Sequence, residues 1–202
     1  MKTIVAISSE PFEYKPWINR NPSIHAFSNG PGPRLAEKAL QTALKAHAKI
    51  DVLLSIGLCG ALDPTLQLND VVCATSVNEW PAEKIPGAKT ARLLSIDRFL
   101  ANVEEKKNFH AQGFGIVEME AAPLAQWAAE TNTKFHAVKV VSDLATEEFA
   151  LDFNAHRDSE GRFKKASIAF AGIRHPRDLY RMASRAGAAS AKLGEFLSKY
   201  EF

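Results

Sequence analysis

The sequence predicts an α/β protein with a single-domain, three-layer α/β/α fold around a central mixed, mostly parallel twisted sheet. Two observations lead to this prediction. Short runs rich in β-branched residues alternate with longer stretches that have helical periodicity. The runs are almost continuously apolar, which is typical of strands buried on both faces between helices. The length of 202 residues fits one such domain, spanning 1–202.

The candidate strands are short apolar runs bounded by polar or glycine-containing segments. The clearest runs lie at 3–7, 51–56, 71–77 and 135–142, and weaker ones lie at 91–95 and 113–117. Their order along the chain, with helical stretches between them, is that of a sheet covered by helices.

The candidate helices have recognisable starts. The turn Gly30-Pro31-Gly32-Pro33 precedes a helix that runs to about residue 48, because proline fits the first helical position. Asp97 is placed to cap a helix that continues through residue 107. Further helices are expected at 119–130 and at 178–200, the second of which is rich in alanine.

Residues 143–166 predict a long loop, because charged and turn-forming residues dominate there and three phenylalanines are interleaved. Loops longer than about 12–15 residues often close over binding sites. The sequence leaves two interpretations open. The loop could close over a site, or it could be a surface loop that its phenylalanines attach to the protein.

Charge and composition exclude several classes of function. The 25 lysines and arginines nearly balance the 23 acidic residues, so the net charge of +2 favours neither nucleic acid nor an anionic membrane surface. The longest apolar run, residues 52–62, is interrupted by polar and glycine residues and is too short to span a membrane. The apolar stretch near the N-terminus is too short for a secretion signal. We therefore expect a cytoplasmic protein without a nucleic-acid partner or a membrane span.

Cysteine and histidine spacing predicts no metal site. Cys59 and Cys73 lack the CxxC spacing of metal and redox sites, so we expect reduced, buried thiols. The six histidines are scattered without the spacing of metal ligands. We expect no metal ion and no cofactor.

Candidate site residues follow the strands, because ligands of open α/β sheets bind beyond the carboxyl ends of the strands. The segments concerned are Ser8-Ser9-Glu10, the glycine-rich turn 57–60, Glu118-Met119-Glu120 and Ser142-Asp143. The turn matches neither a Walker A loop nor the GxGxxG fingerprint, so the sequence does not favour a nucleoside triphosphate or a dinucleotide as ligand. A nicotinamide-dependent dehydrogenase is disfavoured for the same reason.

These segments resemble the nucleoside phosphorylase and nucleosidase superfamily, in particular its methylthioadenosine/adenosylhomocysteine nucleosidase, futalosine hydrolase and hopanoid-associated phosphorylase-like branch. The resemblance rests on SIGLCGA at 55–61 followed by NDVVC at 69–73, on VEMEAA at 117–122 and on VVSD at 140–143. NGPG at 29–32 and SIDRF at 95–99 are similar to two further motifs. The resemblance covers roughly residues 1–145.

The resemblance implies cleavage of the N-glycosidic bond of a purine nucleoside or a 5′-modified nucleoside. In that family the aspartate of the Ser-Asp motif protonates or hydrogen-bonds N7 of the leaving base, a role that falls on Asp143, with Ser142 on the base side. Glu120 would hold the ribose hydroxyls, with Met119 and Glu118 beside the sugar. Glu10 has the spacing of the glutamate that activates water, although Glu13 is a neighbour that could do the same work. Phe99 matches the residue that stacks on the base, and a core position is its alternative.

The loss of two phosphate-binding positions, together with the presence of Glu10, favours hydrolysis over phosphorolysis. In one phosphorolytic branch the glycine turn carries an arginine and a serine that bind phosphate, and here Ser55 and Leu58 stand in their places. The remaining candidates for the sugar or anion side are Gly57, Leu58, Cys59, Gly60, Gly30, Gly32 and Arg34. Pro31 and Pro33 beside them supply no N–H donors.

Two alternatives remain open beside hydrolysis. One is a phosphorylase that uses phosphate as co-substrate, and the other is a catalytically inactive nucleoside-binding protein. The chain is shorter than its relatives usually are, with compression between residues 77 and 91, so the 5′ substituent of the substrate is open. The resemblance also implies a homodimer or a higher homo-oligomer.

Overall fold

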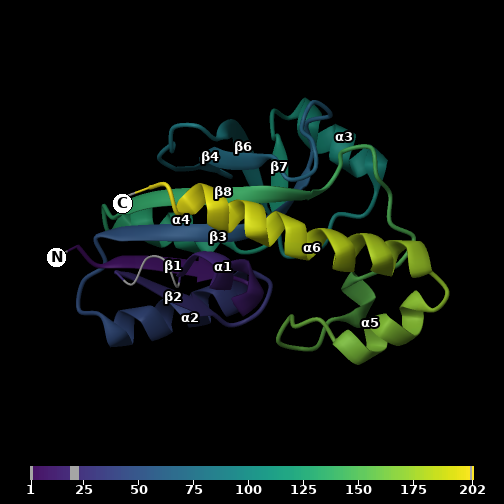
Figure 1. The fold of residues 1–202 in the computed structure, drawn as a ribbon, viewed down its shortest axis with the longest axis horizontal. Coiled ribbons are helices and arrows are strands. Elements are labelled where there is room, and N and C mark those ends of the chain that lie inside the picture. Colours follow the sequence, from purple (N-terminus) through teal and green to yellow (C-terminus); the bar gives the residue numbers. More distant parts are fainter. Residues whose placement is uncertain (1, 19–22, 201) are drawn as a thin grey trace.

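The computed structural model describes residues 2–18, 23–200 and 202, and Figure 1 shows the course of the chain. Helices and strands alternate along it. In chain order the elements are β1 (Ile4–Ser8), the 3₁₀ turn η1 (Pro11–Glu13), α1 (Lys15–Ile18), β2 (Ile24–Ser28), α2 (Pro33–Ala46), β3 (Val52–Ala61), β4 (Val71–Val77), β5 (Trp80–Pro81), β6 (Lys89–Ser95), α3 (Val103–Ala111), β7 (Ile116–Glu118), α4 (Ala121–Glu130), β8 (Lys134–Asp143), the 3₁₀ turn η2 (Asn154–His156), α5 (Lys165–Gly172) and α6 (Pro176–Leu197).

The sheet is mixed, as predicted, but part of it closes on itself instead of remaining open. β2, β1 and β3 are parallel neighbours. β3 pairs with β8 in parallel and with β7 in antiparallel orientation, while β4 joins β8 to β6 and β6 joins β7. The strands β3, β8, β4, β6 and β7 therefore form a closed ring, to which β1 and β2 are attached on one side and the short β5 on the other.

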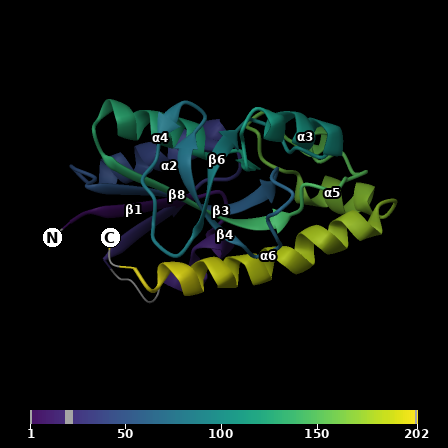
Figure 2. The ribbon, with the colours of Figure 1, turned by 90° about the horizontal axis from the view of Figure 1, so that it is seen from above.

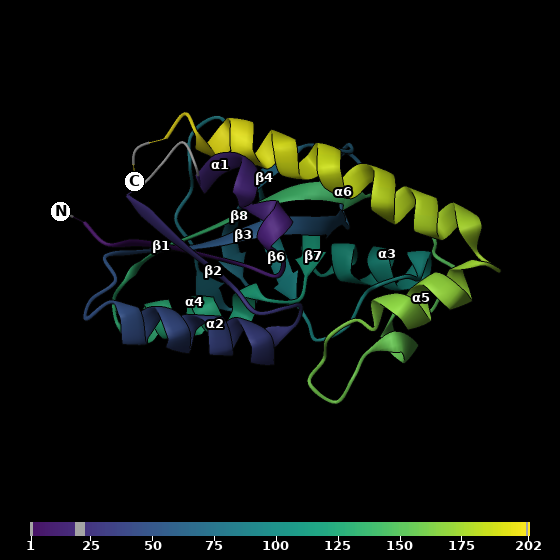
Figure 3. The same ribbon diagram turned by 60° about the horizontal axis from the view of Figure 1, so that its bottom comes forward.

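Helices cover both faces of the sheet, which explains why the strand sequences are apolar at nearly every position. Figure 3 shows α6 and α1 on one side and α2 and α4 on the other. Ile4 and Ala6 of β1 pack in the α6 layer, whereas Val5 and Ile7 pack in the α2 and α4 layer. Successive side chains of a strand point to opposite faces, so only a continuous apolar run satisfies both layers.

One end of the sheet carries the remaining helices, α3 and α5 (Figure 2). β1, β3 and β8 run towards this end, because their parallel pairing aligns their carboxyl ends. Residues 144–164 connect β8 to α5 there and contain a small apolar cluster of Phe149, Leu151 and Phe153. The predicted long loop is thus present and is held down by its own phenylalanines.

The structure corrects two sequence predictions. Residues 57–60, expected as a turn, lie inside β3, where the pairing register with β8 shifts between Cys59 and Gly60. Such bulges bend a strand at the rim of a closed sheet. The helix expected from Asp97 begins instead at Val103 and is capped by the Asn102 side chain, which accepts the N–H of Glu105.

Besides the two 3₁₀ turns, two helices and two strands were not expected from the sequence: α1, α5, β2 and β5. β2 lies at the edge of the sheet and is only partly buried, so its run IHAFS carries a weak strand pattern. The predictions at 71–77 and 135–142 match β4 and β8 closely, because both strands are central and apolar.

Truncation of Leu193 to alanine should lower the free energy of unfolding by about 2–5 kcal/mol, because its side chain is fully buried between α6 and the sheet. Urea denaturation followed by circular dichroism measures this loss. Phe170→Ala on α5 is the control, since that ring is 79% exposed, and it should change the free energy by about 0.5 kcal/mol or less. Similar losses for both variants would contradict the assigned α6 packing.

Candidate active site

A cavity of about 260 Å³ lies at the carboxyl ends of β1, β3, β7 and β8. The segments that line it are far apart in the sequence and include residues that follow β1, the distal part of β3, the link between β7 and α4, and the end of β8. α6 contributes Met182 and Ala186, and the connection after β8 contributes Phe163.

Most of the candidate residues named from the sequence meet at this cavity. Ten line it: Glu10, Leu58, Cys59, Gly60, Phe99, Glu118, Met119, Glu120, Ser142 and Asp143. Gly57, Gly30, Gly32 and Arg34 do not line it. Gly57 lies beneath it against Glu13, and the other three lie along neighbouring surface hollows.

Asp143 is buried and held by an ion pair. Its Oδ2 accepts a hydrogen bond from Nζ of Lys106, a residue of α3, at 2.7 Å. The Ser142 hydroxyl donates to Oδ1 at 3.3 Å. A Cβ at position 60 would come within 2.8 Å of Oδ2, so glycine there leaves the space that the carboxylate occupies.

A second buried ion pair joins Glu118 to Lys139, with Nζ 2.8 Å from Oε2. Glu118 also accepts the backbone N–H groups of Glu120 and Ala121, and so satisfies donors at the start of α4. Burial opposes its charge, but the Lys139 ammonium and these donors hold the pKa of Glu118 below its ordinary value. Burial also opposes the charge of Lys139, yet Glu118, Glu120 and Glu13 raise the pKa of Lys139 above its ordinary value.

Glu120 lies in the same cavity without an ion-pair partner of its own among the described residues. Its Oε1 accepts the N–H of Gly32 at 2.9 Å. Burial, followed by the negative charge of Glu118, raises the pKa of Glu120 to about 8, with Lys139 partly opposing the rise. Burial and the Glu118 charge therefore favour the neutral form of Glu120.

Glu13 occupies the position inside the cavity that the sequence assigned to Glu10. Its carboxylate accepts hydrogen bonds from the Glu10 N–H at 2.8 Å, the Ser9 hydroxyl at 2.9 Å and the Leu58 N–H at 3.2 Å. Burial raises the pKa of Glu13 despite these donors and the Lys139 charge. The Glu10 side chain is 32% exposed and pairs with Lys165 on the surface.

The predicted anion side is already occupied by contacts within the protein. The Gly30 N–H donates to the carbonyl oxygen of Ser9, and the Gly32 N–H donates to Glu120. Arg34 is 61% exposed and pairs with Glu160 at 3.4 Å. The N–H groups of Gly30 and Gly32 are therefore not free to bind an anion.

Phe99 lies between the cavity and a small apolar cluster. Its ring lines the cavity and also packs edge to face on Phe149 and Phe153, with centroids 5.2 Å and 4.9 Å away. The Asn154 side chain bonds both the N–H and the carbonyl oxygen of Phe99, which fixes the ring position.

Sequence reasoning missed the two buried lysines. Lys139 interrupts the apolar run of β8, and a lone charge in a strand buried on both faces is a signal that could have identified it. Lys106 belongs to the polar run EEKKN of α3, which resembles an ordinary exposed helix face, so nothing local distinguished it.

Across the described residues, histidine, cysteine and carboxylate side chains form no cluster of three or more that could hold a metal ion. In the same part of the chain, no helix combines the length and the apolar character needed to cross a membrane.

Solved structures with the same fold include a nucleosidase and a futalosine hydrolase. The 5′-methylthioadenosine nucleosidase of Arabidopsis thaliana in apo form superposes with a TM-score of 0.70 at 14% identity, covering 98% of this chain and 94% of that one. Futalosine hydrolase of Helicobacter pylori superposes with a TM-score of 0.68 at 13% identity, covering 97% and 95%. At these identities the likeness shows the fold.

Sequence comparison identifies the family. The 5′-methylthioadenosine/S-adenosylhomocysteine nucleosidase of Staphylococcus aureus is 28% identical over 154 residues, which cover 58% of this chain and 68% of that protein. A family model described as the phosphorylase superfamily matches residues 20–84 and 81–173. These matches span most of the sequence, and the chain therefore belongs to the phosphorylase superfamily of enzymes.

Proposed function

We propose that the protein hydrolyses the N-glycosidic bond of purine nucleosides or 5′-modified purine nucleosides and releases the free base. The observation that carries this proposal is a single cavity in which two of the lining carboxylates, Glu13 and Asp143, lie in different environments. Glycosidic cleavage builds positive charge on the sugar and negative charge on the leaving group, and hydrolysis also needs a base that activates water. The two carboxylates suit these tasks.

Glu13 is the proposed general base. Its raised pKa makes it a stronger proton acceptor than an exposed glutamate, and three donors fix its orientation. It takes a proton from the water that attacks the sugar carbon and later releases that proton to solvent. Glu10 is the less suitable candidate, because its carboxylate lies at the surface and pairs with Lys165.

Asp143 is the proposed partner of the leaving base. Once N7 of the purine has taken up a proton from solvent, the carboxylate accepts the N7–H as a hydrogen bond and offsets its positive charge. The base then leaves as a neutral molecule. The neighbouring Ser142 hydroxyl can donate a hydrogen bond to Oδ1 of the Asp143 carboxylate.

Glu120 is the proposed ribose ligand, with Met119 and Glu118 beside it in the cavity wall. A neutral carboxylic acid both donates and accepts hydrogen bonds, so it can bind two neighbouring hydroxyl groups. The pKa of about 8 keeps Glu120 in this form at neutral pH.

Hydrolysis is supported over phosphorolysis by the absence of free phosphate donors among the residues around Gly57. Leu58 offers no side-chain hydrogen bond, and Ser55 is fully buried, does not line the cavity and accepts a hydrogen bond from Lys139 at 3.0 Å. The N–H groups of Gly30 and Gly32 are already bonded within the protein. The names of the relatives, nucleosidases and a hydrolase, agree with this proposal.

The purified protein should release free base at the same rate with and without phosphate. The measurement is chromatography of adenosine, inosine, methylthioadenosine, adenosylhomocysteine and futalosine after incubation in the two buffers. Strict dependence on phosphate with ribose 1-phosphate as product would identify a phosphorylase instead. Ligand-induced thermal shifts with no base release would identify a nucleoside-binding protein.

Glu13→Gln should lower kcat by about 10²- to 10⁴-fold, the usual contribution of a general base, while Glu10→Gln should stay within about tenfold of the wild type. Steady-state kinetics on the best substrate of the panel distinguishes them. The two substitutions remove the same charge three residues apart, so each serves as the control of the other. A larger loss of kcat in Glu10→Gln than in Glu13→Gln would instead identify Glu10 as the general base.

Replacing Glu120 by glutamine should make stability less dependent on pH. The pKa of Glu120 is raised from 4.5 to about 8 on folding, so between these values the folded protein holds a proton that the unfolded chain releases. The free energy of unfolding of the wild type should therefore fall relative to Glu120→Gln as pH rises, by at most about 1.4 kcal/mol per pH unit. Urea denaturation of both proteins from about pH 5 to pH 8 measures the difference. Parallel curves would show that Glu120 is ionised throughout.

A further inference from the structure

Lys106 is a fully buried lysine whose ammonium group serves Asp143. Its Nζ donates at 2.7 Å to Oδ2 of Asp143, at 2.9 Å to the carbonyl oxygen of Leu144 and at 3.1 Å to that of Glu147. All three ammonium donors therefore have an acceptor. A buried ammonium is stable only beside an opposite charge, so this arrangement requires Asp143 as the ionised carboxylate.

The ion pair decides which hydrogen bonds Asp143 can offer to a ligand. Oδ2 is engaged by Lys106, and among the described residues Oδ1 meets only the Ser142 hydroxyl at 3.3 Å. That hydroxyl has a single hydrogen and also lies 3.2 Å from the carbonyl oxygen of Cys59. Asp143 therefore presents a fixed oxygen to the cavity that accepts hydrogen bonds and donates none.

Purine bases differ at the edge that this oxygen would meet. A 6-aminopurine carries an N–H donor next to N7, and a protonated N7 adds a second donor beside it. A 6-oxopurine carries a carbonyl oxygen at the same place, so an ionised carboxylate and a second acceptor face each other there. When two acceptors face each other in a buried site, neither forms a hydrogen bond there. Both have lost their hydrogen bonds to water, so the free energy of binding becomes less favourable.

We propose that Lys106 is a specificity-determining positioning residue, which fixes Asp143 as an ionised acceptor and so makes the cavity take 6-aminopurine nucleosides in preference to 6-oxopurine nucleosides. This inference rests on the proposed nucleosidase function and names the base that its substrates carry.

A purely structural role for Lys106 makes a different prediction. Its bonds to Leu144 and Glu147 also attach α3 to the segment after β8, so its loss could lower stability alone. Stability loss by itself would affect both classes of base equally. The ratio of the two rates therefore separates the roles.

The test compares adenosine with inosine, which differ in the group at C6 and in the hydrogen that inosine carries on N1. For the wild type, kcat/KM should be higher for adenosine by about 10- to 100-fold, the range of one hydrogen bond to a charged group. In Lys106→Met the buried Asp143 carboxylate has lost the cation that holds its Oδ2, so it is no longer fixed as an acceptor. The ratio should then fall by about tenfold or more, and Lys106→Arg, which keeps the charge, should retain more of it than Lys106→Met.

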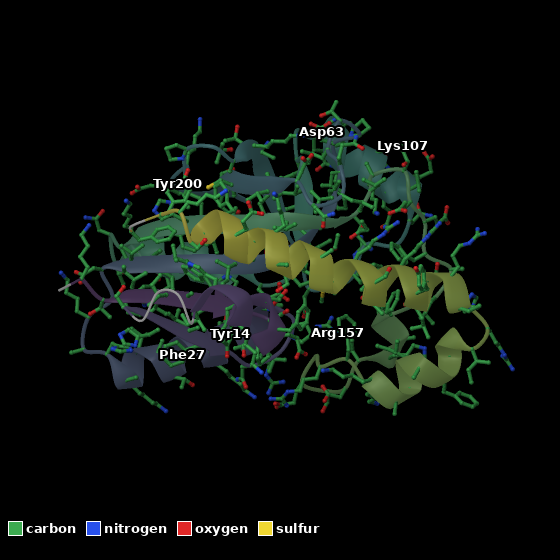
Figure 4. All side chains as sticks on the ribbon, in the orientation of Figure 1. Tyr14, Phe27, Asp63, Lys107, Arg157 and Tyr200 are labelled. Carbon is green, nitrogen blue, oxygen red and sulfur yellow. The ribbon has the colours of Figure 1, made fainter. Side chains whose placement is uncertain are left out.

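Lys107→Met is the matched control. Lys107 follows Lys106 in the same helix, but its side chain is 64% exposed at the outside of α3 and pairs with Glu104 (Figure 4). Its replacement should leave the ratio unchanged. Melting temperatures of all variants show whether each is folded.

A binding measurement keeps the inference testable if Lys106→Met does not fold. Free adenine should raise the melting temperature of the wild type more than hypoxanthine does at equal concentration. Equal turnover of adenosine and inosine, equal shifts by the two bases, or an unchanged ratio in folded Lys106→Met would overturn the inference while leaving the nucleosidase proposal intact. No base release from any nucleoside, together with no shift by either base, would refute the proposed function and this inference with it.

Discussion

The buried ammonium of Lys139 is the interaction on which the rest of the site depends. Glu13, Glu118 and Glu120 share one cavity, and burial of three carboxylates without a cation would drive all of them towards their neutral forms. The contact of Lys139 with Glu118 at 2.8 Å keeps that glutamate charged, so it can bind the N–H groups at the start of α4. Loss of one partner of such a pair commonly costs about 3–5 kcal/mol. The same ion pair thus supports the fold and sets the protonation of Glu13 and Glu120.

Closure of the sheet brings the parts of the cavity together. β3 pairs with β1, β8 and β7, and near its end Gly60 is the register partner of both Val117 and Asp143. The VEMEAA and VVSD segments therefore reach the same place only when β7 and β8 have both paired with β3. A side chain at position 60 would meet the Asp143 carboxylate. The strand pairing that closes the ring therefore also brings the segments of the site together.

The proposal that water is the nucleophile rests on how the backbone donors are used. In phosphorolytic relatives, arginines and hydroxyl side chains around the glycine turns hold phosphate. Here the Gly30 and Gly32 N–H groups bond Ser9 and Glu120, and Arg34 pairs at the surface. Donors consumed by internal contacts are not available to an anion. Water beside Glu13 is the nucleophile that suits such a cavity.

The sequence by itself determined the central strands, the order of the motifs and most residues of the candidate site, because apolar runs and short motifs are local properties of the chain. β4 and β8 lie where they were predicted, and the residues at 118–120 and 142–143 line the cavity. Tertiary structure alone decided the ring of strands and the burial of Glu13 instead of Glu10. It also decided that Asp97 pairs with Arg157 while α3 starts at Val103, and that Lys106 pairs with Asp143. The physical reason is that strand pairing and the charge of a buried group depend on partners distant in the sequence, which no local pattern specifies.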